Sequence, residues 1–236
     1  MSTLASLLQV AVRHQLFERH AVAREAPAVP EQRLWDPGLF AQEQLRRLVR
    51  QVFFPGWPRP AHHVAFAGIE EGTGIGPICM HVGQILAVQA PGNTCVVEAN
   101  PYVKDEEAAG VEDTCSADLR SCARHIANKL WLLPQRTFLG ECADGASAAW
   151  LECRMEKLRL AFDYTVLHVP AAAHHSEAAV LAHLSDGAVL VLEANATRRV
   201  AAHRVKETMQ AANVRVLGTV LTGRTFPIPE RIYRKL

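Results

Sequence analysis

One stretch of the chain, residues 62–77 with the sequence HHVAFAGIEEGTGIGP, limits the possible folds more than any other. A short apolar run leads into a glycine-rich loop, and the residues after the loop suit a helix. Strand, glycine loop and helix in this order begin the phosphate-binding site of many α/β proteins. However, Ile75 stands where a working phosphate loop carries lysine. Taken alone, such a short motif more often marks a tight turn without a ligand.

The remainder of the chain alternates apolar runs with helical patterns. We expect strands at 63–67, 94–99, 130–134, 164–169, 187–193 and 214–221. We expect helices at 77–90, 116–128, 148–162 and 175–185, and a last helix that is N-capped by Thr197 and has Val200, Val205, Met209 and Ala212 on one face. Buried strands that alternate with helices predict an α/β three-layer sandwich with a mostly parallel sheet. Right-handed crossovers place the ends of the first, second and fourth strands along one edge, where such folds bind ligands.

The first quarter of the chain has a different character. Residues 3–24 predict an amphipathic helix, and the proline-rich residues 26–38 predict a linker. A second helix is expected at about 39–54, with Phe40, Leu45, Leu48 and Val49 on one side. We therefore divide the chain into a helical extension with its linker, 1–58, and an α/β domain, 59–236.

Composition excludes several classes of protein. The net charge of +1 argues against a dominant nucleic-acid surface, and no apolar run is long enough to cross a bilayer. The apolar N-terminus has no basic leader, and the six cysteines form no CxxC pair. These features predict a cytoplasmic protein with reduced thiols.

The order of these pieces resembles one family, the cytoplasmic tyrosine kinase domains of bacterial capsule and exopolysaccharide synthesis, a branch of the MinD/ParA-like P-loop ATPases. The resemblance runs from about Phe40 to the C-terminus. It rests on the segments GIEEGTGIG, VVEANPY, TVLHVP and DGAVLVLEANATRR, and on the closing VRVLGTVLTGRTFPIPERIYRKL. It implies ATP and Mg²⁺ as cofactors. It also implies a partner in a membrane polysaccharide co-polymerase or export complex, and hence a peripheral place at the inner face of the plasma membrane.

The first family motif falls on the degenerate phosphate loop Gly72, Thr73, Gly74, Ile75 and Gly76. In the family, a lysine at the position of Ile75 balances phosphate charge, and a hydroxyl at the position of Gly76 holds Mg²⁺. Ile75 cannot neutralise charge, although backbone N–H groups could still cradle a phosphate at the start of the helix.

The second and third motifs have also changed. The family's D-x-D-x-R falls on Glu98, Asn100 and Tyr102, and its Walker B-like aspartate falls on His168. Glu98 keeps a carboxylate that would hold Mg²⁺ if the metal binds, but an amide such as Asn100 cannot act as a general base. Imidazole is a poor ligand for Mg²⁺, so Glu98 and His168 could instead form a polar pair at the strand ends.

Other candidate sites rest on less. The resemblance makes Thr222 and Arg224 candidates for the edge of a nucleotide base. His168 would lie near the adjacent His174 and His175 in this topology, so a transition-metal site is a minor alternative. The family's self-association motif E-x-x-R-x-x-R is matched by Glu43 and Arg46 but meets Val49 at its third position, so a homo-oligomer is implied only in outline.

These observations favour a degenerate member of the family, without kinase or ATPase chemistry, that acts as an adaptor or regulator of polysaccharide synthesis and export. One alternative is an active tyrosine autokinase or ATPase that binds ATP through backbone amides, with a basic group supplied by a neighbouring chain. Another is a positioning ATPase like ParA or MinD.

Overall fold

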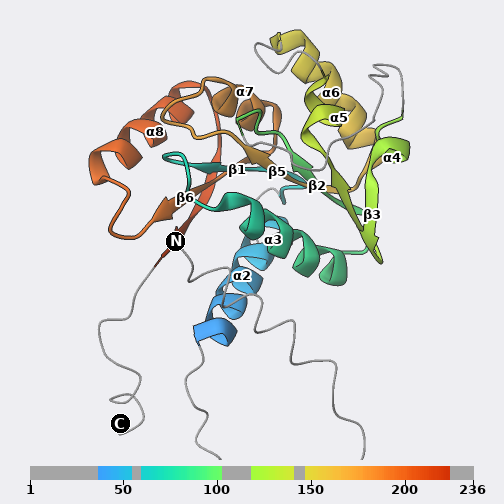
Figure 1. Ribbon diagram of the computed structural model, residues 1–236, viewed down its shortest axis with the longest axis horizontal. Helices are drawn as coiled ribbons and strands as arrows, with labels where there is room; N and C mark the ends of the chain where they lie inside the picture. Colours follow the sequence, from blue (N-terminus) through green and yellow to red (C-terminus); the bar gives the residue numbers. More distant parts are fainter. Residues whose placement is uncertain (1–36, 55–59, 103–117, 141–146, 224–236) are drawn as a thin grey trace, which may run out of the picture. The chain divides into compact units, whose positions relative to one another are not determined.

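The computed structural model describes residues 37–54, 60–102, 118–140 and 147–223 (Figure 1). A compact unit, Arg46–Arg224, contains the sheet and the candidate site, and a smaller unit comprises Met1–Leu45 and Thr225–Leu236. The predicted helix at 3–24 and most of the predicted linker lie outside the described residues. The boundary between residues 58 and 59 stays a prediction.

The described strands form one seven-stranded sheet in the order β3-β4-β2-β5-β1-β6-β7. Their bounds are His63–Gly68 (β1), Thr94–Glu98 (β2), Arg124–Ala127 (β3), Leu130–Leu133 (β4), Tyr164–Val169 (β5), Gly187–Glu193 (β6) and Val216–Thr222 (β7). Neighbouring strands are parallel except β3 and β4. The central strands β1 and β5 are buried along their whole length, which explains their continuous apolar sequence.

Helices cover both faces of the sheet (Figure 1). Their bounds are Pro37–Phe53 (α2), Ile75–Gln89 (α3), Leu119–Cys122 (α4), Gln135–Leu139 (α5), Ala148–Ala161 (α6), Glu177–Leu184 (α7) and Arg199–Ala211 (α8). Helix α3 packs on β1, β2 and β5 at one face. Helices α5 to α8 pack on the opposite face, around the apolar core described below. The predicted three-layer α/β sandwich is therefore confirmed.

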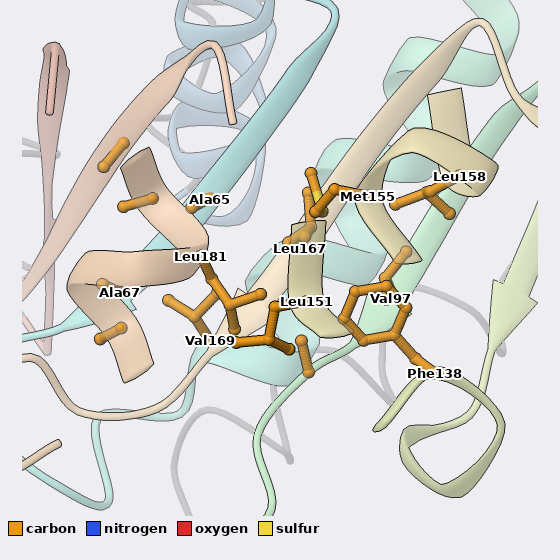
Figure 2. Close-up of a cluster of buried hydrophobic side chains, with 14 of the residues drawn as sticks. Ala65, Ala67, Val97, Phe138, Leu151, Met155, Leu158, Leu167, Val169 and Leu181 are labelled. Carbon is orange, nitrogen blue, oxygen red and sulfur yellow. The ribbon is translucent and has the colours of Figure 1, made fainter. Parts of the chain in front are cut away.

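The core on that opposite face is shown in Figure 2. Helix α6 contributes Leu151, Met155 and Leu158, which recur at positions i, i+4 and i+7 and so share one side of the helix. These side chains meet Val97 of β2 and Leu167 of β5. The helix predicted at 148–162 is thus confirmed as α6, Ala148–Ala161.

The helix predicted at 116–128 is wrong. The described part of this segment contains the four-residue α4 and then β3, which pairs antiparallel with β4. Asn128 adopts a positive φ of 46°, a conformation that asparagine tolerates and that suits the turn between the two strands. The imidazole of His125 packs on Trp131 across this hairpin, a tertiary contact that the local pattern does not reveal.

Two details of the other predicted helices are also wrong. The N–H of Glu193 donates to Thr197 Oγ1, so the Thr197 hydroxyl closes a turn and α8 starts only after Arg198. Val200 is exposed, whereas Val205 and Met209 are buried. A helix turns about 100° per residue, so Val200, five residues before Val205, points about 140° away from it around the helix axis.

The second predicted helix needs a similar correction. It begins at Pro37 and buries Val49, Val52 and Phe53, whereas Phe40 is exposed. Nine residues separate Phe40 from Val49, which places them on opposite sides of a helix. None of the described helices combines the length and the hydrophobicity that crossing a bilayer requires.

Candidate functional site

The candidate site lies where β1, β5 and β2 end side by side. Parallel pairing sets Ala67 opposite Val169 and Glu98 opposite His168, so the loops after all three strands leave the same edge of the sheet. The glycine loop follows β1 and leads directly into α3. This is the edge at which open α/β sheets bind ligands, as the sequence predicted.

The glycine loop is closed by its own backbone and side chains. Gly72 and Gly74 have φ values of 78° and 64°, a left-handed conformation that favours glycine. Between them Thr73 is buried, and its hydroxyl donates a hydrogen bond to the carbonyl of Glu70. The Thr73 hydroxyl is thus committed to the loop itself.

Ile75 turns inward over the start of the loop. A β-carbon added to Gly68 would lie 2.8 Å from Ile75 Cδ1 and 2.7 Å from Thr73 Oγ1. A side chain at residue 68 would have to displace these two side chains, which occupy the space above the glycine. The isoleucine is 7% exposed, so its side chain packs within the loop and does not project into solvent.

The first turn of α3 retains the simplest feature of an anion site. Its N-cap, Gly74, has no side chain to bond the first N–H groups of the helix, so these donors are not satisfied by a capping side chain. Pro77 lacks an N–H and removes one donor from this turn. Residues 68–77 contain no lysine or arginine.

His168 lies beside this turn. A β-carbon added to Gly76 would be 3.8 Å from both Nδ1 and Cε1 of its imidazole ring. Burial lowers the pKa of His168 from its usual value of 6.5 to about 4, so the ring is neutral at neutral pH. The strand pairing places Glu98 opposite His168, as the proposed polar pair requires.

Glu98 also lies near the second turn of α3. Burial raises the pKa of the Cys79 thiol far above its usual range, and the negative charge of Glu98 adds to this shift. The Cys79 thiol is therefore protonated at neutral pH, and a metal would have to displace this proton to bind the thiolate. The described residues in and around the glycine loop thus include the carboxylates of Glu70, Glu71 and Glu98, the neutral imidazole of His168 and the buried thiol of Cys79.

Asn100 and Tyr102, at family positions that carry charge, here shape a loop. Asn100 Oδ1 accepts a hydrogen bond of 3.1 Å from the backbone N–H of Tyr102. The Tyr102 ring stacks on His175, with ring centroids 3.7 Å apart. His175 Nε2 in turn lies 3.1 Å from Glu71 Oε1 of the glycine loop.

The remaining candidates are dispersed. The Thr222 hydroxyl donates to the carbonyl of Leu192 and so joins β7 to β6, and Arg224 lies outside the described residues. Among described residues no three His, Cys, Asp or Glu side chains are grouped to hold a metal ion, so the alternative built on His168, His174 and His175 gains no support.

These residues do not match the usual donors for Mg²⁺ and ATP. Mg²⁺ takes hard oxygen ligands, and P-loop proteins add a lysine that reaches the β- and γ-phosphates. At the corresponding positions the structure has His168 with a neutral ring, and Ile75 packed on Gly68. We therefore derive no step that runs through a bound nucleotide.

Strand order and the loop after β1 together define the class: the chain has the three-layer α/β fold of the MinD/ParA-like P-loop ATPases. No known family model matches the sequence, and no curated protein matches it. The evidence for the class is therefore structural.

Solved structures with this fold include bacterial tyrosine kinase domains. The VpsO kinase domain is 17% identical to this chain, with a TM-score of 0.62 over 79% of this chain and 98% of the other. The kinase domain of the Escherichia coli tyrosine kinase ETK is 18% identical, with a TM-score of 0.61 over 93% and 89% of the two chains. MinD of Aquifex aeolicus is 15% identical, with a TM-score of 0.52 over 74% and 73%. At these identities the likeness confirms the predicted fold.

Sequence reasoning missed the part played by Glu71 and His175. Both were visible as polar residues in loops after predicted strands, but their contact spans 104 residues of sequence. The signal that could have found them is topological, because both loops follow strands expected to end at one edge.

Proposed function

We propose that this chain is a tyrosine-kinase-like protein of bacterial polysaccharide synthesis that has lost phosphoryl-transfer chemistry and acts as an adaptor or regulator. The observation that carries the proposal is the inward packing of Ile75 at the position of the phosphate-binding lysine. An aliphatic side chain there supplies no positive charge for a phosphate.

The other motif positions support the same reading. Asn100 closes a backbone turn, and His168 is a neutral, buried ring at the position of the Walker B-like aspartate. Charge stabilisers in phosphoryl transfer are worth about 10³-fold or more in rate, so losing the lysine together with two of the three acidic groups should abolish measurable turnover.

The adaptor role is proposed from the parts of the fold that the chain retains. The sheet and its apolar core are complete, so the chain retains a folded surface that an adaptor could present to a partner. By the resemblance of its motifs, the partner is a membrane polysaccharide co-polymerase or export complex, and the protein works in the cytoplasm at the inner face of that membrane. Self-association through the helix that carries Glu43 and Arg46 belongs to the same proposal.

One observation favours a second candidate, an enzyme that binds ATP weakly. The N-terminus of α3 has no capping side chain, so its first N–H groups could receive a phosphate. Glu98 would then hold Mg²⁺, and a neighbouring chain would supply the missing positive charge. A positioning ATPase like ParA or MinD would in addition dimerise when ATP binds.

A titration of the purified full-length chain with labelled ATP, with and without Mg²⁺, separates these functions. We expect no Mg²⁺-dependent binding at micromolar ATP and no phosphotyrosine. Micromolar binding with turnover would overturn the proposal in favour of the enzyme, and ATP-dependent dimers in sedimentation would favour the positioning ATPase.

A pair of variants tests the role of Ile75 directly. Ile75→Lys restores the missing charge and should raise ATP affinity by at least about tenfold over the parent chain, because backbone donors of the loop remain. Ile75→Met has a similar length without the charge and should leave affinity unchanged. Equal affinity in the two variants would show that charge at residue 75 does not limit binding.

A further inference from the structure

Three loops at the candidate site are fastened to one another by side chains. Glu71 lies in the loop after β1, Tyr102 in the loop after β2, and His175 in the loop after β5. The Tyr102 ring stacks on His175 at 3.7 Å, and His175 Nε2 lies 3.1 Å from Glu71 Oε1. We call these three residues the rim latch.

The position of Tyr102 is itself prepared by its own loop. Asn100 Oδ1 accepts from the N–H of Tyr102, and the N–H of Ala99 donates to the carbonyl of His168 across the sheet. The turn that begins at Asn100 therefore starts from a fixed strand end and directs the tyrosine toward the loop after β5. Tyr102 is 50% exposed, yet one face of its ring is held.

Backbone bonds join the other two loops at their base. The N–H of Ala172 donates to the carbonyl of Gly68 at 2.8 Å, and the N–H of Ala173 donates to the carbonyl of Ile69 at 3.1 Å. Beyond them, the N–H of His175 bonds back to the carbonyl of Ala171 and closes a turn. The rim latch thus closes the outer end of two loops that are already joined at the inner end.

In nucleotide-dependent switches, the γ-phosphate and its Mg²⁺ order such loops, which loosen when the ligand leaves. We propose that the rim latch replaces the nucleotide in this role and holds the three loops in one arrangement without any ligand. This inference rests on the proposed function in one respect: the proposed function identifies these loops as the ones that a nucleotide would order. It makes the site a fixed surface, suitable for constant presentation to a partner.

Hydrogen exchange of the full-length chain without nucleotide tests the latch. His175→Ala and Tyr102→Ala should each accelerate amide exchange in residues 69–74 and 171–176 by about tenfold, equivalent to about 1.4 kcal/mol of local opening free energy. Tyr102→Phe keeps the ring and should behave like the parent chain. The matched control is His174→Ala, because His174 is exposed, adjoins His175 and takes no part in the hydrogen bond between His175 and Glu71.

Glu71→Ala removes the acceptor for His175 Nε2 and guards against general unfolding, because Glu71 is exposed and its loss should spare the core. It should still accelerate exchange in residues 171–176, about 100 residues away in sequence. The proposal would be overturned if residues 171–176 exchanged at the same rate in all three latch variants as in the His174→Ala control. Protection of the loops by added Mg²⁺ and ATP in the parent chain would contradict both the latch and the proposed function, whereas a failed latch without such protection leaves the proposed function standing.

Discussion

At the scale of single residues, His168 shows how burial sets chemistry at this site. Its folded-state pKa of about 4 lies below the usual 6.5, so the unfolded chain binds a proton more readily than the folded chain between these values. Stability therefore rises with pH through this window. The contribution of His168 is complete above about pH 6.5 and is lost as the pH falls toward 4.

This sign predicts a measurable acid sensitivity. Between pH 7.5 and pH 5, the parent chain should lose on the order of 2 kcal/mol of unfolding free energy through His168 alone, as judged by urea denaturation at both values. His63, whose pKa is also lowered to about 4, chiefly by burial, adds to the loss. His168→Gln should remove the part of this pH-dependent loss of unfolding free energy that His168 contributes. His203→Gln, an exposed histidine on α8, should leave the difference unchanged, and equal pH dependence in the two variants would contradict the assignment.

At the scale of elements, the packing of α3 on the sheet depends on one glycine. A β-carbon on Gly83 would lie 2.4 Å from Val96 Cγ2 of β2, closer than any real contact. The missing side chain lets the helix backbone approach the strand, and this contact also holds the glycine loop in place because α3 begins directly after it.

Gly83→Ala should consequently destabilise the chain by about 1–2 kcal/mol, since overpacking outweighs the gain in helix propensity of about 1 kcal/mol. The double variant with Val96→Ala relieves the clash, and in that background the same glycine substitution should be neutral or stabilising. The unfolding free energies of this double-mutant cycle are measured by chemical denaturation. If the effects of the two substitutions are additive, residues 83 and 96 do not interact sterically.

At the scale of the whole molecule, an apolar core lies between the sheet and helices α5 to α8 (Figure 2). Leu158 on α6 is fully buried in it, whereas Leu160 two residues later is 90% exposed. The two leucines share a helix and differ only in the side that they occupy.

Leu158→Ala should cost about 2–5 kcal/mol of unfolding free energy, because it removes a buried side chain and leaves a cavity. Leu160→Ala should change stability by less than about 0.5 kcal/mol. Thermal or urea unfolding of both variants checks this prediction, and similar losses would show that α6 is not oriented as described.

Sequence reasoning succeeded wherever a local pattern had a single structural solution. The apolar runs at β1, β5 and β6 each predicted a buried strand to within about one residue, because a run of this kind fits only a strand covered on both sides. The helix predicted at 148–162 likewise matches α6, Ala148–Ala161. The positions of Ile75 and His168 at the sheet edge followed from the expected parallel order.

Sequence reasoning failed where a contact between residues far apart in the sequence determined the local structure. The segment that became β3 carries a pattern compatible with a helix, and pairing with β4 overrides it. Thr197 suits an N-cap, but its hydroxyl bonds the N–H of Glu193 and delays the helix. In both cases the local preference is small compared with the free energy of the alternative hydrogen bonds.

By itself, the sequence determined that the chain builds a mostly parallel sheet with a glycine loop at one edge, and that no lysine or arginine lies in this loop. Those properties depend on periodicity and residue identity, which are local. Only the tertiary structure decided that Ile75 packs onto Gly68 and that Glu71, Tyr102 and His175 meet across three loops. These contacts depend on where separate strands end in space, and no stretch of sequence specifies that distance alone.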